Sequence, residues 1–93
     1  MMKQYRINFA NVKTKHEFYD CVVEGLKLPA WCGRNPDAIW DMLTGYMEHE
    51  MTIYIENINI VAETLYNDVM IFRKILENAV KLYDGKFKVD FIS

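Results

Sequence analysis

Three short strand-like segments, separated by segments of helical periodicity, limit most strongly how this chain can fold. Apolar and polar side chains alternate in the first segment, Tyr5 to Phe9, and in the last, Lys86 to Ile92. The middle segment, Met51 to Ile55, is the most apolar short run and should be the most buried strand. Strands separated by helices pair in parallel through crossover connections. Because the outer segments alternate, we expect an α/β fold of two layers, a three-stranded parallel sheet with helices packed mainly on one face.

Helix signals fill the intervals between these strands. Thr14 and Glu17 have the spacing of a capping box and predict the start of a first helix. A short helix capped by Asn57 and a longer one from about Asn67 to Tyr83 follow the middle strand, and Asp84-Gly85 ends the longer one. The side chains expected to face the core are Phe18, Cys21, Val22 and Gly25 or Leu26 in the first helix, Ile58, Val61 and Leu65 in the short one, and Val69, Phe72, Leu76, Ala79 and Tyr83 in the longer one.

The sequence around residue 36 predicts another helix, with acidic side chains along one side. Asn35 can cap free backbone N–H groups, Pro36 suits the first helical position, and Asp37 favours the positive end of the helix dipole. The apolar face would hold Ala38, Ile39, Met42, Leu43 and Tyr46, and the acidic stripe Asp37, Asp41, Thr44 and Glu48. Gly45 lies where such a helix can loosen or end. Two aspartates one turn apart repel each other, so the stripe is better suited to a cationic partner than to solubility alone.

The charge of the chain is distributed unevenly. Its formal net charge is -2, yet residues 35–72 contain no Lys or Arg. The acids of this middle third are Asp37, Asp41, Glu48, Glu50, Glu56, Glu63 and Asp68. A segment of this kind projects a negative field that attracts cationic partners and repels nucleic acid, so direct binding of DNA or RNA is disfavoured.

Length and composition are those of an ordinary globular protein. The 93 residues, with 52% hydrophobic and 26% charged side chains, suit one domain over residues 1–93. The first residues lack the apolar run of a signal peptide and no segment is apolar enough to span a membrane, so we expect a cytoplasmic protein with no membrane partner. Cys21 and Cys32 are too few for a disulfide framework, and we interpret them as a partly buried core thiol and a loop thiol.

Enzyme and metal-site hypotheses have weak support in the sequence. Cys32 could form a catalytic group with His16 or His49, but no local signature accompanies it. Asp37, Asp41 and His49 are close in sequence and could hold a hard cation, yet two ligands on one helix are too few for a tight site. We therefore expect no catalytic residues, no metal and no cofactor.

Three aromatic side chains accompany the acidic stripe. Trp31 lies in a loop between a proline and a glycine, where a large ring has little reason to be buried, and it suits an interface hot spot. Trp40 lies between the apolar face and the acids and is expected at the edge of the core. Tyr46 either closes the core or makes a contact at the end of the helix. These features favour a protein-binding surface in which an acidic helix enters a concave, basic site.

This stretch resembles the barstar family of ribonuclease inhibitors. The residues that carry the resemblance are Leu28-Pro29, Trp31, Gly33, Asn35, Asp37-Ala38, Trp40-Asp41, Leu43-Thr44-Gly45, Tyr46 and Glu48. Their order and spacing are those of the binding loop and second helix of that family. The resemblance implies a barstar-like fold and an inhibitor, monomeric when free, that covers the active site of a small basic, barnase-like ribonuclease. The alternative is a barstar-like interaction module whose partner is another toxin or a regulatory protein.

The same resemblance implies roles for individual residues. Asp41 would enter the phosphate pocket of the nuclease, with Asp37 beside it on a basic side chain. Trp31 would pack on the catalytic face, and Trp40 would be structural and partly exposed beside the interface. The other expected partner-binding residues are Asn35, Thr44, Gly45, Tyr46 and Glu48.

The chain also departs from the family pattern. Arg34 places a cation just before the helix, where it would weaken the acidic surface, and Cys32 replaces a second loop aromatic. Tyr46 stands for a larger ring. The family recruits an acid from its last helix as well, for which Glu77 is the candidate here, although Glu77 could instead pair with Arg73 four residues earlier.

Overall fold

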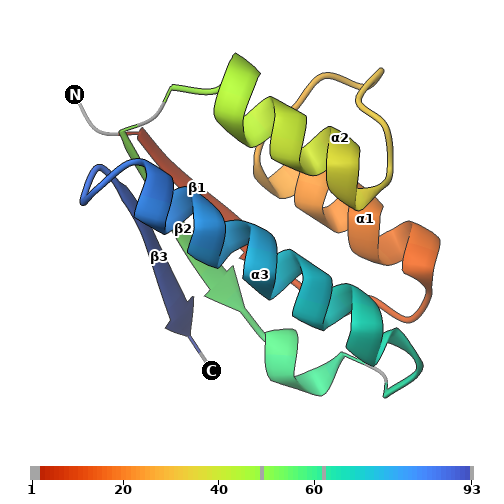
Figure 1. Cartoon of the computed structure of the whole chain (residues 1–93). Coiled ribbons are helices and arrows are strands. Elements are labelled where there is room, and N and C mark those ends of the chain that lie inside the picture. The colour runs from red at the N-terminus through yellow and green to blue at the C-terminus, as the bar shows by residue number, and fades with distance from the viewer. Residues whose placement is uncertain (1–2, 49, 62, 93) are drawn as a thin grey trace.

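A parallel three-stranded sheet forms one layer of the protein. The computed structural model describes residues 3–48, 50–61 and 63–92. The strands are β1 (Lys3–Asn8), β2 (Met51–Glu56) and β3 (Phe87–Ile92). β2 lies in the middle and pairs in parallel with both neighbours, so that Tyr5, Ile53 and Val89 are aligned across the sheet (Figure 1). The predicted parallel sheet is confirmed, and its most apolar segment is the central strand.

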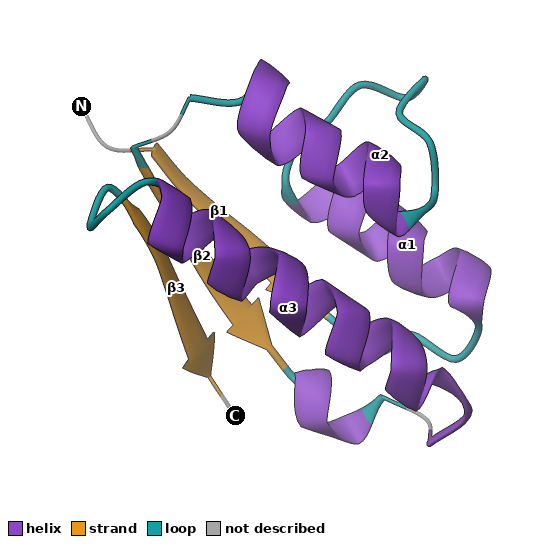
Figure 2. Cartoon of the chain, in the orientation of Figure 1, coloured by secondary structure: helices purple, strands orange, loops and turns teal. Residues whose placement is uncertain are grey.

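Helices on one side of the sheet form the second layer. Their bounds are α1 Lys15–Gly25, α2 Pro36–Asp41, a π-helical turn η1 Met42–Tyr46 that continues α2, and α3 Tyr66–Leu82. α1 contacts β1, α3 contacts β3, and α2 packs on α3 (Figures 1 and 2). The expected two-layer α/β fold is therefore confirmed. In the part of the chain that is described, no helix is long and apolar enough to cross a membrane.

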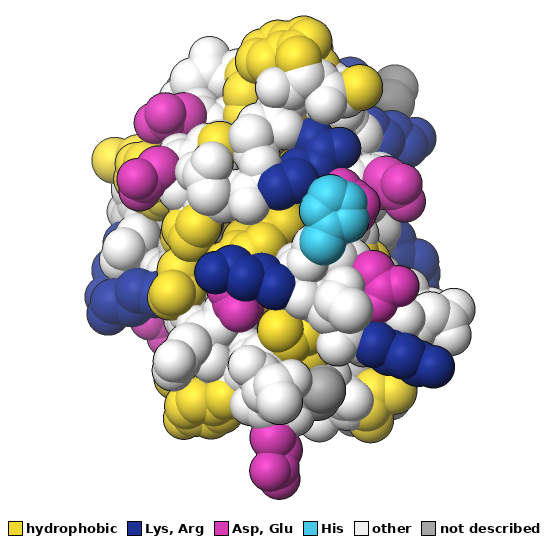
Figure 3. All heavy atoms as spheres, turned by 90° about the vertical axis from the view of Figure 1, so that its right-hand side faces the viewer, with side chains coloured by type: hydrophobic (Ala, Val, Ile, Leu, Met, Phe, Trp, Pro, Cys, Tyr) yellow, Lys and Arg dark blue, Asp and Glu magenta, His cyan; other side chains and the backbone are white. Residues whose placement is uncertain are grey.

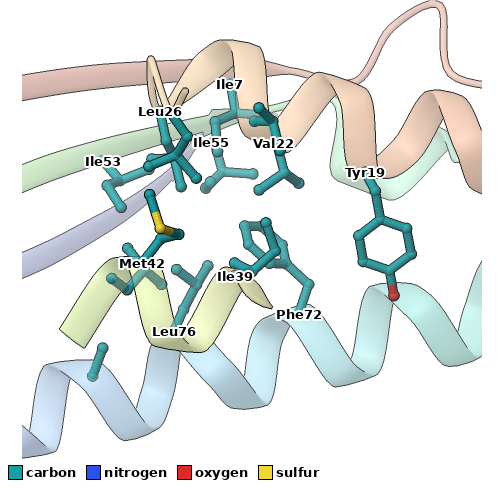
Figure 4. Close-up of a cluster of buried hydrophobic side chains, with 14 of the residues drawn as sticks. Ile7, Tyr19, Val22, Leu26, Ile39, Met42, Ile53, Ile55, Phe72 and Leu76 are labelled. Atoms are coloured by element: carbon teal, nitrogen blue, oxygen red, sulfur yellow. The ribbon is translucent and has the colours of Figure 1, made fainter. Parts of the chain in front are cut away.

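The core lies between the sheet and the helices. β2 turns Met51, Ile53 and Ile55 inward, and all three are fully buried. The side chains that converge with β2 in Figure 4 are Ile7 of β1, Val22 and Leu26 of α1, Ile39 of α2, Met42 of η1, and Phe72 and Leu76 of α3. Every strand and helix of the fold contributes to this one buried cluster, and β3 does so through the ring of Phe87.

The opposite face of the sheet is polar. Thr52, Tyr54 and Glu56 alternate with the buried residues of β2 and are half-buried. Arg6 of β1 lies over the ring of Tyr54, with 5.4 Å between the guanidinium carbon and the ring centre, and its Nη1 is 2.7 Å from Oε1 of Glu56. Because these groups satisfy one another and water, this face does not need a second layer of helices.

The predicted capping box forms at the start of α1, whereas the predicted cap after β2 does not form. The N–H of Glu17 donates to Oγ1 of Thr14, and the N–H of Thr14 donates to Oε1 of Glu17, both at 3.1 Å. Asn57 does precede a short 3-10 helix, η2 (Ile58–Ile60), but its side chain makes no capping bond and donates to Oδ1 of Asn8 at 2.8 Å instead. The single short helix of the prediction is also wrong, because a second 3-10 helix, η3 (Glu63–Leu65), is separate.

α3 starts and ends within one residue of the predicted helix, and Asp84 and Gly85 follow it with positive φ angles. The predicted pair between Arg73 and Glu77 is wrong. The guanidinium of Arg73 lies over the ring of Phe91, 4.7 Å from its centre, and Oε2 of Glu77 is 3.8 Å from Nζ of Lys74. Phe91 lies near the end of the edge strand β3 and remains partly exposed beside this guanidinium.

Gly25 allows α1 to approach β1, which generates a first prediction. A Cβ at this position would lie 2.6 Å from Cγ1 of Ile7 and 3.0 Å from the carbonyl oxygen of Arg6. We expect Gly25→Ala to lower the free energy of unfolding by about 1–3 kcal/mol in urea denaturation, because α1 must move away from the strand. Gly45→Ala is the matched control, since no atom lies within 4 Å of its added Cβ. Equal losses in both variants would contradict this packing explanation.

Candidate functional site

The candidate site consists of the loop 29–34, α2 and η1, which follow one another in the chain. Asn35 caps α2 as predicted, because its Oδ1 accepts a hydrogen bond from the N–H of Ala38 at 2.8 Å and Pro36 takes the first helical position. Gly33 brings the loop close to this cap. A Cβ on Gly33 would lie 2.9 Å from Nδ2 of Asn35 and 3.0 Å from Cβ of Ala38. A side chain at position 33 would therefore force Asn35 or Ala38 to shift.

The helix widens into the π-helical turn η1 after α2. The N–H of Met47 donates to the carbonyl of Met42 at 2.9 Å, a bond that spans five residues. The hydroxyl of Thr44 donates to the carbonyl of Trp40 at 2.8 Å, and the hydroxyl of Tyr83 at the end of α3 donates to the carbonyl of Thr44 at 3.2 Å. α3 thus anchors the far end of the site.

This turn shortens the predicted acidic stripe. Asp37 and Asp41 are both exposed on α2, one turn apart, as expected. Thr44 is half-buried and its hydroxyl is bonded within the helix, while Glu48 lies beyond the end of η1 at Tyr46. The four-residue stripe is therefore wrong after Asp41, because a π-helical turn holds more residues than the 3.6 on which the prediction was based.

The two aspartates of α2 carry free charges. Neither Asp37 nor Asp41 forms a salt bridge with a residue that the structure describes. Other acids of the middle third are engaged, since Glu56 pairs with β1 and Asp68 accepts a hydrogen bond from the hydroxyl of Tyr19 at 2.8 Å. The exposed side of α2 therefore carries negative charge that no described residue of the protein compensates.

The structure brings two aromatic rings of the site together. The rings of Trp31 and Tyr46 meet edge to face, with 6.4 Å between their centres, and they are 74% and 59% exposed. Trp31 is exposed as predicted, and Tyr46 takes the outward of its two predicted positions. Trp40 is half-buried against the core, as expected for a residue at its edge. The contact between Trp31 and Tyr46 had no signal in the sequence, because the two residues lie on different elements.

Arg34 does not act as a free cation. Its Nε is 2.8 Å from Oδ1 of Asp20 on α1, and its Nη1 donates to the carbonyls of Ala30 and Cys32. The hydrogen bond from Arg34 is the main cause that lowers the pKa of the Asp20 carboxyl. The expectation that Arg34 weakens the acidic surface is wrong, because Asp20 neutralises it. Sequence analysis missed Asp20, whose only local signal was its spacing of four residues from His16 on the first helix.

Both thiols have environments unsuited to nucleophilic chemistry. Cys32, interpreted as a loop thiol, is only 4% exposed and belongs to the core, so that interpretation is corrected. Burial raises the pKa of the Cys32 thiol, although the charge of Arg34 lowers it in part. Burial also raises the pKa of the half-buried Cys21 to about 11. Both side chains are therefore neutral at physiological pH, and a neutral thiol is a poor nucleophile.

The described residues contain no group of three or more His, Cys, Asp and Glu side chains that could hold a metal ion. His49, which the sequence suggested as a partner of Cys32 or of the aspartates, lies outside those residues.

A groove of about 390 Å³ between α2 and α3 adjoins the aspartates. Its walls are Pro36, Asp37 and Trp40 on α2, and Ile71, Lys74, Ile75 and Asn78 on α3. Glu77, the acid expected from the last helix, does not line this groove. Sequence analysis missed Lys74, which brings a cation to the same groove as Asp37 and whose only signal was its position three residues after Ile71 on the predicted helix.

Comparison with known proteins finds similarity over almost the whole chain. Residues 2–92 match the family model described as "Barstar (barnase inhibitor)". A protein of Bacillus subtilis (strain 168) named "Putative ribonuclease inhibitor YrdF" is 28% identical over 85 residues, which cover 88% of this chain and 87% of that protein. The family match includes all three strands as well as the loop, α2 and η1.

The cap of α2 gives a second prediction. Asn35→Ala removes the acceptor for the N–H of Ala38. We expect the free energy of unfolding to fall by about 1 kcal/mol in chemical denaturation, and the amides of the first turn of α2 to exchange hydrogen faster. Asn35→Asp is the control, since a carboxylate can accept the same bond. A loss of stability as large in Asn35→Asp would show that the capping bond is not the cause.

Proposed function

The chain belongs to the barstar family, and from this premise we propose that it inhibits a small ribonuclease by placing α2 and the preceding loop in the active site of the enzyme. Binding is one-to-one and requires no chemistry by the inhibitor, which covers the basic cleft where RNA phosphates bind. The name of the Bacillus subtilis relative supports a ribonuclease-inhibitor role.

The observation that carries this proposal is a pair of exposed carboxylates on a capped helix. Asp37 and Asp41 lie one turn apart on α2, and no described cation neutralises them. A carboxylate on a rigid helix can occupy a phosphate subsite and accept charge-assisted hydrogen bonds from Arg and His side chains there. We assign Asp41 the central position in that subsite and Asp37 a basic side chain beside it.

The aromatic pair supplies an apolar anchor next to the charges. Trp31 and Tyr46 support each other edge to face, so both rings lose little freedom when a partner covers them. Large aromatic side chains that are buried on binding contribute much of the affinity of an interface. Trp40 is half-buried against the core, where it keeps α2 in place, and contributes contact only at its exposed edge.

The ends of the helix contribute polar and backbone contacts. Asn35 and Thr44 offer polar groups at the start of α2 and in η1. The space around Gly45 is open, since no atom lies within 4 Å of a Cβ placed there, so a partner can approach its backbone closely. Glu48 is exposed just after η1 and adds to the negative field.

We place the protein in the cytoplasm, as a monomer when free. Cys21 and Cys32 are unpaired, which agrees with a reducing compartment. An inhibitor there would protect the cell from a nuclease toxin before that toxin leaves it.

A third prediction tests the central contact. We expect Asp41→Asn to weaken inhibition of the target ribonuclease by about a hundredfold or more, without a change in Tm, because an amide cannot neutralise a cationic pocket. Inhibition constants are measured against a panel of small, secreted microbial ribonucleases. Glu63→Gln is the matched control, with the same charge change at an exposed acid of η3. Equal effects of the two variants would exclude Asp41 as the central contact. If the wild type inhibits no member and another partner is captured, the alternative of an interaction module holds.

A fourth prediction concerns the rate of association. The negative field of α2 should guide the basic enzyme toward it, so the association rate constant in stopped-flow experiments should fall steeply as salt is added. The dissociation rate constant should change less, since contacts at close range are screened less. An association rate that does not depend on salt would contradict electrostatic guidance.

A further inference from the structure

Arg34 binds the backbone on both sides of Trp31. Its Nη1 donates to the carbonyl oxygen of Ala30 at 3.1 Å and to the carbonyl oxygen of Cys32. Ala30 and Cys32 are the residues directly before and after Trp31. One guanidinium group therefore holds a backbone carbonyl on each side of this exposed indole ring.

Asp20 holds the guanidinium group in place. Its Oδ1 is 2.8 Å from Nε of Arg34, and its Oδ2 is 2.9 Å from Nε2 of His16, one turn earlier on α1. Figure 3 shows this side of the molecule, where a histidine side chain lies among basic and acidic ones. Because α1 packs on β1, the contacts that run from the backbone beside Trp31 through Arg34 to Asp20 end on a packed part of the fold.

The loop has a second anchor at Cys32. The N–H of Cys32 donates to the carbonyl of Pro29 at 3.0 Å, which closes a tight turn, and its side chain is buried. Trp31 thus projects outward from a segment that is held on its inner side by a buried thiol and by Arg34. These two anchors, Cys32 and Arg34, are typical of a loop that keeps one conformation.

We propose that Arg34 is a positioning residue, which keeps residues 30–32 in one conformation and presents Trp31 to the ribonuclease in the shape in which it binds. This inference rests on the proposed function. A loop that is ordered before binding avoids the loss of conformational entropy that a mobile loop would suffer in the complex. The proposal also explains a cation beside an acidic surface, because Asp20 removes its net charge.

Lysine cannot take over this role. Arg34 uses Nε toward Asp20 and Nη1 toward the two carbonyls, so its donors lie in one rigid plane. Lysine offers a single ammonium group on a flexible stem and cannot hold three acceptors in the same positions. Arg34→Lys therefore keeps the charge and removes the geometry.

The first test uses the free protein and the exchange of single amide hydrogens. In Arg34→Lys we expect the amide of Cys32 to exchange about tenfold faster or more, while the amide of Ile39 on α2 is unchanged. Asp20→Asn should have the same effect. Arg6→Lys is the matched control, since Arg6 pairs with Glu56 on the polar face of the sheet. Unchanged exchange at Cys32 in Arg34→Lys would overturn the proposal.

The second test measures Kd for a ribonuclease that the wild type inhibits. We expect Arg34→Lys to raise Kd about tenfold, but to have little further effect in a Trp31→Ala background. An equal rise in both backgrounds would mean a general structural role and would overturn the proposal. If the wild type inhibits no ribonuclease of the panel, the proposed function fails, whereas the exchange of the Cys32 amide still decides whether Arg34 orders the loop.

Discussion

The burial of one face of β2 is the interaction on which the other elements depend. Met51, Ile53 and Ile55 are fully buried. α1, which precedes β2 in the chain, and α3, which follows it, pack on the same side of the sheet. α1 contacts β1 and α3 contacts β3, so these two helices occupy the inner face of the sheet. α2 packs on α3 and keeps one side exposed. The position of α2 in the candidate site follows from this arrangement, because it is a helix that the sheet does not fully cover.

The exposed helix is nevertheless held by hydrogen bonds at both ends. Asn35 fixes its first turn, the hydroxyl of Tyr83 bonds to the carbonyl of Thr44 in η1, and Arg34 ties the preceding loop to Asp20 on α1. The bonds of Tyr83 and Arg34 join the surface to α3 and α1, which are themselves packed in the core. A surface held in this way can bind without a large loss of conformational entropy, which leaves more of the contact energy as affinity.

The acids of the chain divide into two groups with different consequences. Glu56, Asp68 and Asp20 have partners and support the fold. Asp37 and Asp41 have none among the described residues and repel each other across one helical turn, which costs the isolated helix a few tenths of a kcal/mol. The fold tolerates this cost because the cap and the buried side of α2 compensate for it. Free charge kept at a small cost in stability is typical of a surface shaped by binding.

The sequence by itself determined the features that depend on neighbours along the chain. Four local features could be predicted, because such signals act over a few residues. They are the alternation in β1 and β3, the capping box of α1, the Asn35-Pro36-Asp37 start of α2 and the end of α3 at Asp84-Gly85. Only the tertiary structure decided that Cys32 is buried, that Trp31 meets Tyr46 and that Arg34 pairs with Asp20. It also decided the π-helical turn, whose carbonyl at Thr44 accepts a hydrogen bond from Tyr83, the residue after α3. These features depend on which elements lie side by side after packing, and no local pattern of residues contains that information.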